Sequence, residues 1–137
     1  MDHYTGSCLC GGIQYEIRGK LEPVQICHCQ QCRKAQGAAL VTNVPVSTDQ
    51  FSITQGEDLL KAYESSPGKE RVFCSHCGSP IISRLKSLPG VVRIRAGTLN
   101  GEPPLELSDH AYVGSKANWW PITDDLLRLD AGRPPKK

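Results

Sequence analysis

The spacing of its cysteines constrains this chain more than any other feature. Seven cysteines occur in 137 residues, in the patterns C-x-C, C-x-C-x-x-C and C-x-x-C. Such spacings bring sulfur atoms close enough to share a metal ion, and an odd number of cysteines cannot pair completely as disulfides. The sequence therefore predicts a protein that binds metal through thiolates.

Two cysteine pairs complement each other as one closed site. Cys74 and Cys77 in FCSHCGSP form a C-x-x-C knuckle, which turns both sulfurs toward one ion. A redox pair is the alternative, but no helix pattern follows to lower a thiol pKa. Cys8 and Cys10 in SCLCGG share a face if that segment is extended. The four cysteines predict a structural zinc site with four protein ligands.

Three cysteines remain, all within ICHCQQCRKAQG: Cys27, Cys29 and Cys32. Three protein ligands with a fourth position open to water or substrate are typical of a catalytic zinc. The alternative is a single zinc held by any four cysteines, with three thiols left free and prone to oxidation. We favour two zinc ions and treat Cys27, Cys29 and Cys32 as the catalytic site.

His110 is the best candidate for a fourth ligand, or for an acid or base, at this second zinc. An ordinary half-buried strand histidine is the alternative. His28 points away from its neighbouring cysteines if the segment is extended, so we expect it to pack rather than bind metal. Trp119 and Trp120 are expected to close the core, although one of them could form the wall of a ligand site.

Short apolar-alternating runs separated by Gly and Pro predict a mainly β fold of short antiparallel strands with little helix. The expected strand regions are residues 11–19, 39–46, 51–54, 59–65, 71–74, 80–85 and 91–97. Two segments favour a helix: residues 30–37, with Gly37 as the stop, and residues 123–129. We expect a single zinc-containing domain over residues 1–130 and a disordered tail over residues 131–137.

Composition narrows the possible partners and the compartment. The formal net charge is +2, and thiolates bound to zinc would remove even this small basic excess, so nucleic acid is not an expected partner. No segment is apolar and long enough for a membrane span, and the N-terminus lacks the pattern of a signal peptide. Free thiolates favour a reducing compartment, so we expect the protein to be cytoplasmic.

Four motifs in order, SCLCGG, CHCQQCRKAQG, FCSHCGSP and DHAYVGSKANWW, extend over nearly the whole chain. Together they resemble the family of glutathione-dependent formaldehyde-activating enzymes, whose domain also occurs in the centromere protein V group. The resemblance implies an Mss4-like zinc-containing fold, with the same division of the cysteines into a structural and a catalytic site. It also implies a carbon–sulfur lyase that joins glutathione and formaldehyde into S-hydroxymethylglutathione.

Glutathione has two carboxylates, so cations near the catalytic site would be needed to bind it. Arg33, Lys34 and Lys116 are the candidates, with Arg93 and Arg95 as second choices; solvated surface charge is the alternative for each. The rival function is a non-catalytic zinc-stabilised β domain that binds a protein partner. A pocket beside an open metal position would favour the enzyme, whereas an apolar patch and a fully ligated second metal would favour the binding domain.

Overall fold

Two β-sheets and one short α-helix make up residues 2–133, the part of the chain that this computed structural model describes. The small sheet has the spatial order β1 (His3–Ser7), β2 (Gln14–Arg18) and β5 (Phe51–Gln55). The large sheet has the order β11 (Leu127–Arg128), β10 (Leu107–Ala111), β3 (Val24–Cys27), β4 (Val41–Ser47), β9 (Val91–Arg95), β8 (Pro80–Leu85), β7 (Lys69–Cys74) and β6 (Leu60–Ser66). Paired strands are antiparallel, except that β10 runs parallel to both β3 and β11.

The predicted mainly β fold with little helix is confirmed, and each expected strand region contains a strand. The α-helix, α1 (Gln30–Gln36), lies where the sequence predicts it. Gly37 ends the helix with a φ of 62°, in the left-handed region that glycine adopts without strain. Short 3-10 turns cover Thr48–Gln50, Glu57–Leu59, Ala96–Thr98 and Val113–Ser115. Within residues 2–133 no helix is long and apolar enough to cross a membrane.

The second predicted helix, over residues 123–129, is wrong. Its backbone instead adds strand β11 to the large sheet, where Leu127 pairs with Asp109 and Arg128 with His110. The Leu129 amide also donates to the His110 carbonyl at 2.8 Å. Hydrogen bonds to an existing strand satisfy this segment's polar backbone, and they outweigh the weak helix propensity of so short a run.

One face of the large sheet is apolar and forms the core. In the register across four neighbouring strands, Val44 faces Ile94, Ile94 faces Ile82, and Ile82 faces Val72. The small sheet packs against them through the alternating residues of β2, among them Tyr15 and others of the buried cluster. Each such side chain, when fully buried, stabilises the fold by about 1.5–3 kcal/mol.

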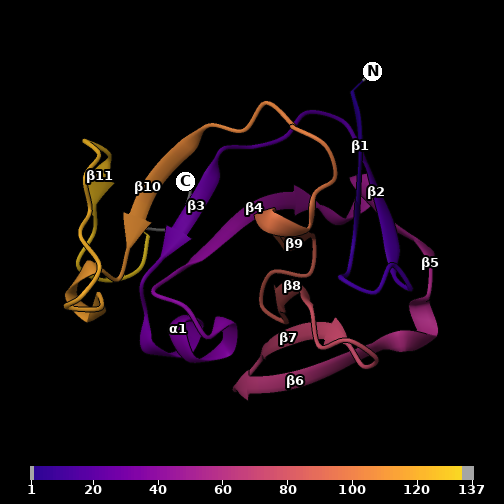
Figure 1. The fold of residues 1–137 in the computed structure, drawn as a ribbon, viewed down its shortest axis with the longest axis horizontal. Coiled ribbons are helices and arrows are strands. Elements are labelled where there is room, and N and C mark those ends of the chain that lie inside the picture. The colour runs from indigo at the N-terminus through magenta and orange to yellow at the C-terminus, as the bar shows by residue number, and fades with distance from the viewer. Residues whose placement is uncertain (1, 134–137) are drawn as a thin grey trace.

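The opposite face of the same strands is polar. Asn43 pairs with Arg95, and Arg93 pairs with Ser83, which in turn pairs with Arg71. Because successive side chains on a strand alternate between faces, these residues point away from the apolar core. The sheet curls around α1 on this side, while β1, β2 and β5 lie on the other (Figure 1). The helix therefore covers a polar surface rather than an apolar one.

The C-terminal region contacts the large sheet edge. Arg133 bonds to Asp109, and the Tyr112 amide donates to the Ala131 carbonyl at 3.1 Å. The first residues of the predicted tail thus make contacts, and residues 134–137 lie outside the described residues. The expectation that both tryptophans close the core is wrong, because Trp119 and Trp120 are 62% and 42% exposed.

Candidate metal centres and an adjoining pocket

Two cysteine clusters could hold metal ions. In the first, the ligand atoms of Cys8, Cys10, Cys74 and Cys77 all lie within 4.8 Å of one another. Cys8 and Cys74 are buried members of the apolar core, Cys77 packs against it, and Cys10 is exposed. This cluster therefore fastens the turn between β1 and β2 to the end of β7.

The local backbone at this cluster differs from the extended C-x-C segment that we expected. Leu9 and Cys10 lie in a turn, in which the Gly11 amide donates to the Cys8 carbonyl at 3.1 Å. Backbone amides also donate to sulfur: Ile13 to Cys8 at 3.3 Å and Cys77 to Cys74 at 3.4 Å. Such bonds stabilise thiolates, the form that binds metal.

The second cluster has three sulfurs, which also lie within 4.8 Å of one another. Cys27 ends β3, Cys29 is the residue that caps the start of α1, and Cys32 lies buried in the first turn of that helix. The Cys32 amide donates to Cys29 Sγ at 3.3 Å, and the Sγ atoms of Cys32 and Cys27 are 3.4 Å apart. Among residues 2–133, the cluster contains no fourth His, Cys, Asp or Glu.

A buried guanidinium contacts this second cluster from the sheet. Arg71 Nη2 on β7 donates to Cys32 Sγ at 3.7 Å. The pKa of Cys32 is lowered, first by hydrogen bonds from Cys27 and Cys29 and then by Arg71. The pKa of Cys27 is raised, mainly by its interaction with Cys29. Negative charge in the cluster is therefore favoured on Cys32, the sulfur that Arg71 contacts.

His110 contacts a second histidine rather than the sulfurs. Its Nδ1 atom lies 2.8 Å from His28 Nε2, and its Nε2 atom lies 3.0 Å from an oxygen of Asp124. An ionised Asp124 accepts from His110 Nε2–H, which leaves His110 Nδ1 to accept from His28 Nε2–H. With both ring nitrogens bonded, His110 has none to offer a metal in this arrangement, and its predicted catalytic role stays a prediction.

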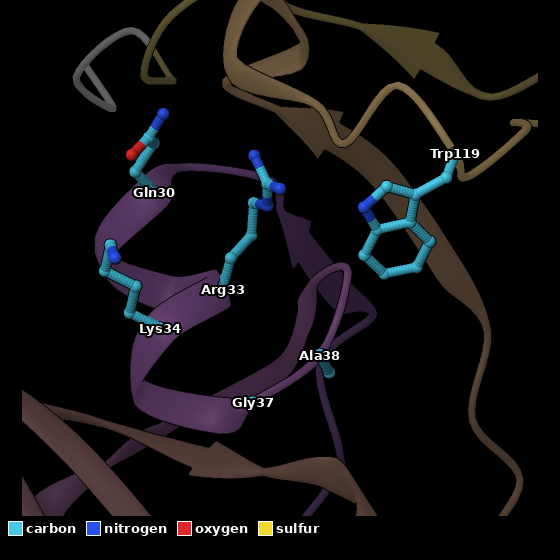
Figure 2. A pocket seen from close by; sticks show the side chains of 6 residues that line it. All are labelled: Gln30, Arg33, Lys34, Gly37, Ala38 and Trp119. Atoms are coloured by element: carbon cyan, nitrogen blue, oxygen red, sulfur yellow. The ribbon is translucent and has the colours of Figure 1, made fainter.

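A cavity of about 300 Å³ opens on the exposed side of α1. Its walls are formed by Gln30, Arg33, Lys34, Gly37, Ala38 and Trp119. Figure 2 shows Arg33 extending from the helix toward the segment of Trp119, whose indole faces the helix. Arg33 Nη1 donates to the Ser115 carbonyl at 3.1 Å, which fixes its direction. The cavity thus combines two cations with one aromatic wall.

The structure separates the five cations that the sequence proposed. Arg33 and Lys34 line the cavity on α1, whereas the Lys116 ammonium donates to the carbonyls of Ala117 and Trp120 at 2.8 and 2.6 Å. Arg93 and Arg95 lie on the polar face of the sheet under α1. The candidate cations are therefore separated into a pair at the cavity, a pair on the sheet and Lys116, which is bonded to backbone carbonyls.

Sequence reasoning missed Arg71, Asn43 and Asp124 as members of this region. Asn43 accepts from Arg95, and Asp124 approaches His110 from a different part of the chain. The alternation of Arg with Val and Ile in VVRIR was an available signal for a polar sheet face. No comparable pattern pointed to Asp124.

Comparison with known proteins identifies the family. The sequence pattern described as glutathione-dependent formaldehyde-activating enzyme matches residues 3–115, most of the chain. The chain belongs to this family. The cysteines of both clusters lie within the matched range, as do Arg33 and His110. The match to this family covers the first three motifs on which the resemblance was based and the beginning of the fourth.

Two relatives place the chain within known sequences and folds. An uncharacterized lyase of Schizosaccharomyces pombe is 31% identical over 81 residues, which are 59% of this chain and 57% of the yeast protein. The match thus spans little more than half of that relative. A crystal structure of a Rhodobacter sphaeroides protein is similar with a TM-score of 0.62 and 20% identity, covering 73% of this chain and 91% of that one. The second likeness supports the fold alone.

Proposed function

We propose that this protein is a zinc-dependent carbon–sulfur lyase that adds a thiol such as glutathione to a small aldehyde such as formaldehyde. The observation that supports this most directly is the three-cysteine cluster, which has no fourth protein ligand within residues 2–133. Family membership makes thiol and aldehyde the natural substrates. The four-cysteine cluster is then the structural zinc site.

The donor atoms of both clusters suit zinc. Thiolate sulfur is a soft ligand that selects zinc over calcium or magnesium, and all seven cysteines are free. Seven free thiols also fit a reducing compartment such as the cytoplasm. At Cys27, Cys29 and Cys32, a bound zinc would supply an open coordination position that favours the thiolate form of an incoming thiol. The cluster geometry is thus compatible with three ligands provided by protein and one by substrate.

The chain's own residues prepare the sulfurs for this role. Arg71 donates to Cys32 Sγ and offsets part of the negative charge of three thiolates. His28 lies between two of the ligands in sequence and is tied through His110 to Asp124. A hydrogen-bonded chain of this kind fixes the backbone that presents Cys27 and Cys29.

The cavity on α1 suits a glutathione-like substrate. Arg33 and Lys34 follow Cys32 directly on the helix and provide cations for a carboxylate. Trp119 provides an apolar wall for the peptide. A cavity of about 300 Å³ accommodates part of a tripeptide.

The proposal is tested by measuring exchange between formaldehyde and S-hydroxymethylglutathione by NMR, with the protein loaded with zinc. We expect an exchange rate clearly above the spontaneous rate, lost on removal of zinc and restored on its return. Glutathione dimethyl ester provides the matched control substrate, because it keeps the thiol and lacks both carboxylates. A rate no faster than the spontaneous reaction, with two zinc ions bound, would argue for the non-catalytic binding domain instead.

A further inference from the structure

Two buried arginines on the polar face of the large sheet lack an acidic partner. Arg71 is 8% exposed and Arg95 is 5% exposed. Arg71 donates to Ser65 and Cys32, and Arg95 donates to the amide oxygen of Asn43. No aspartate or glutamate in residues 2–133 forms an ion pair with either. Arg71 Nη1 and Arg95 Nε have no hydrogen-bond partner among the described residues.

The three-cysteine cluster cannot balance this charge alone once it holds a metal. Three thiolates around a divalent ion leave one net negative charge, whereas two guanidinium groups carry two positive charges. Lys69 and Arg93, both half-buried on neighbouring positions of the same face, add to the excess. A buried charge without a counter-charge is costly, so this region is prepared to receive an anion.

A second cavity opens at Arg95. It has a volume of about 290 Å³. The residues that form its walls are Gln36, Ala38, Leu40, Val41, Thr42, Ser79, Pro80, Arg95, Gly97 and Thr98. Arg95 is the one charged residue among them, and the hydroxyl and amide side chains around it are hydrogen-bond donors.

This second cavity adjoins the proposed active site. Its wall residue Val41 pairs with the ligand Cys27 across β4 and β3. Ala38 belongs to the walls of both cavities, so the two spaces approach each other beyond the C-terminal end of α1. Burial and the charge of Arg71 lower the pKa of Arg95 to about 10, and the sulfurs of Cys32 and Cys27 act in the opposite direction. At neutral pH the guanidinium is still charged.

We propose that the cavity at Arg95 is an anion-binding subsite that receives a carboxylate of the substrate beside the three-cysteine cluster. Arg95 is in the wall of this cavity, its Nη1 atom donates to Asn43, and its Nε atom has no hydrogen-bond partner among the described residues. The carboxylate belongs either to the thiol substrate or to an oxo-acid aldehyde. The proposal builds on the thiol–aldehyde function, but it concerns binding and can be tested without turnover.

Gly97 allows a test that leaves the arginines in place. A Cβ atom added at Gly97 would meet no heavy atom within 4 Å, so a small side chain can begin there without displacing a neighbour. Gly97→Asp places a carboxylate in the cavity wall, and Gly97→Asn is the uncharged control of nearly equal size. Because the added carboxylate competes for Arg95, we expect anion affinity to fall about tenfold in Gly97→Asp and to stay near wild type in Gly97→Asn.

Two probes distinguish the source of the carboxylate, each titrated calorimetrically into the zinc-loaded protein. S-methylglutathione has the carboxylates of the thiol substrate but no free thiol, and glyoxylate is the simplest aldehyde with a carboxylate. Loss of S-methylglutathione binding in Gly97→Asp assigns the subsite to the thiol; loss of glyoxylate binding assigns it to the aldehyde. Equal affinities in the two Gly97 variants, or no binding of either probe to wild type at millimolar concentration, would overturn the proposal.

A second pair of variants tests Arg95 itself. Arg95→Met removes the charge and keeps the length, and Arg84→Met is the control on an exposed arginine paired with Glu70. We expect Arg95→Met to reduce binding of the responding probe about tenfold or more, with Arg84→Met unchanged. Should Arg95→Met fail to fold, the Gly97 pair still decides the question. If the protein showed no exchange activity but still bound a probe in a way that depends on Arg95, the lyase function would be rejected and the anion subsite would be retained.

Discussion

The two cysteine clusters lie against opposite faces of one sheet, and their surroundings differ accordingly. Cys8 and Cys74 belong to the apolar core, and the four sulfurs there could complete the coordination shell of a metal ion. Cys27 and Cys32 lie on the polar face, where Arg71 approaches the sulfurs. The first cluster is closed by its own ligands, whereas the second has three ligands and a positively charged surrounding.

The proposed division into a structural and a catalytic site rests on this difference. A closed tetrahedral metal site in an apolar setting has no open coordination position for a substrate, and its metal-binding energy contributes to folding. A three-sulfur site beside cations and cavities can share its metal and its surroundings with a substrate. Side chains alternate between the two faces along each strand of the large sheet, and this alternation separates the apolar surroundings of one cluster from the polar surroundings of the other.

Removing a ligand from the closed cluster should have the largest effect. Zinc binding at structural sites is worth about 10–16 kcal/mol, comparable to the whole stability of a domain at about 5–15 kcal/mol. We expect Cys74→Ser to unfold or aggregate, as monitored by circular dichroism and size-exclusion chromatography. A well-folded Cys74→Ser variant with wild-type Tm would contradict a structural role for this cluster.

The corresponding substitution in the three-cysteine cluster should abolish activity without unfolding the protein. Cys29→Ser should keep the circular dichroism spectrum of the wild type, lower the zinc content from about two to about one per chain, and abolish thiol-dependent turnover. Zinc content is measured by metal analysis of the purified protein. If Cys29→Ser and Cys74→Ser behaved alike, or if the wild type held a single zinc, the contrast between the clusters would fail.

Arg71 contacts the three-cysteine cluster, so replacing it should weaken zinc binding at that cluster and leave zinc binding at the four-cysteine cluster unchanged. Arg71→Met removes the donor to Cys32 Sγ, and loss of such a supporting contact costs about 10–100-fold in metal affinity. Competition with a chromogenic chelator resolves the weaker zinc from the tighter one. Arg84→Met on the neighbouring strand is the control, because that arginine is exposed and pairs with Glu70. Equal zinc affinities in both variants would remove Arg71 from this role.

The cations of the first cavity should affect substrate binding more than chemistry. Lys34→Ala should raise the KM for glutathione several-fold with little change in kcat, because an exposed ion pair contributes about 0.2–1 kcal/mol. Arg33→Ala should have a larger effect, since Arg33 is also held by the Ser115 carbonyl. Both effects should disappear with glutathione dimethyl ester. Persistence of the KM change with the ester would mean that these residues do not bind a carboxylate.

The smallest effect is expected at Asp124, whose hydrogen bond from His110 lowers the pKa of this carboxyl. A lowered pKa stabilises the folded state above the ordinary pKa of aspartate, and the contribution is lost as pH falls through the folded value. Asp124→Asn should therefore lower Tm by a few degrees at pH 7, and the difference should shrink as pH falls below about 4, the ordinary pKa of aspartate. A difference independent of pH would show that the charge of Asp124 is not involved.

Local sequence patterns predicted most of the fold. Strand alternation and the Gly37 stop act over a few residues, so β2, β4 to β9 and α1 follow from them, whereas β1, β3, β10 and β11 lie outside the expected strand regions. The segment at residues 123–129 could not be predicted in this way, because its pairing partner β10 lies in another part of the sequence. The turn at Leu9 and Cys10 was missed because a C-x-C pattern does not distinguish extended backbone from a turn.

The candidate site likewise combines features that local sequence patterns predict with features that depend on distant parts of the chain. Spacing alone grouped the cysteines, since ligands of one metal must converge. The contact between Arg71 and Cys32 depends on the curvature that brings β7 under α1, and the bond between His28 and His110 joins residues 82 positions apart. Contacts of that kind are set by strand register and sheet shape, which no short motif encodes.

The position of Cys29 and Cys32 in α1 has a consequence for how the protein matures. A helix of seven residues is marginal by itself, and here its capping residue and first turn provide two of the three sulfurs. Arg33, Lys34 and the remaining helical wall of the first cavity depend on that same turn. A metal bound by these sulfurs would therefore also hold the first turn of α1 in place, so the ion would fix part of the wall of the first cavity before substrate binds.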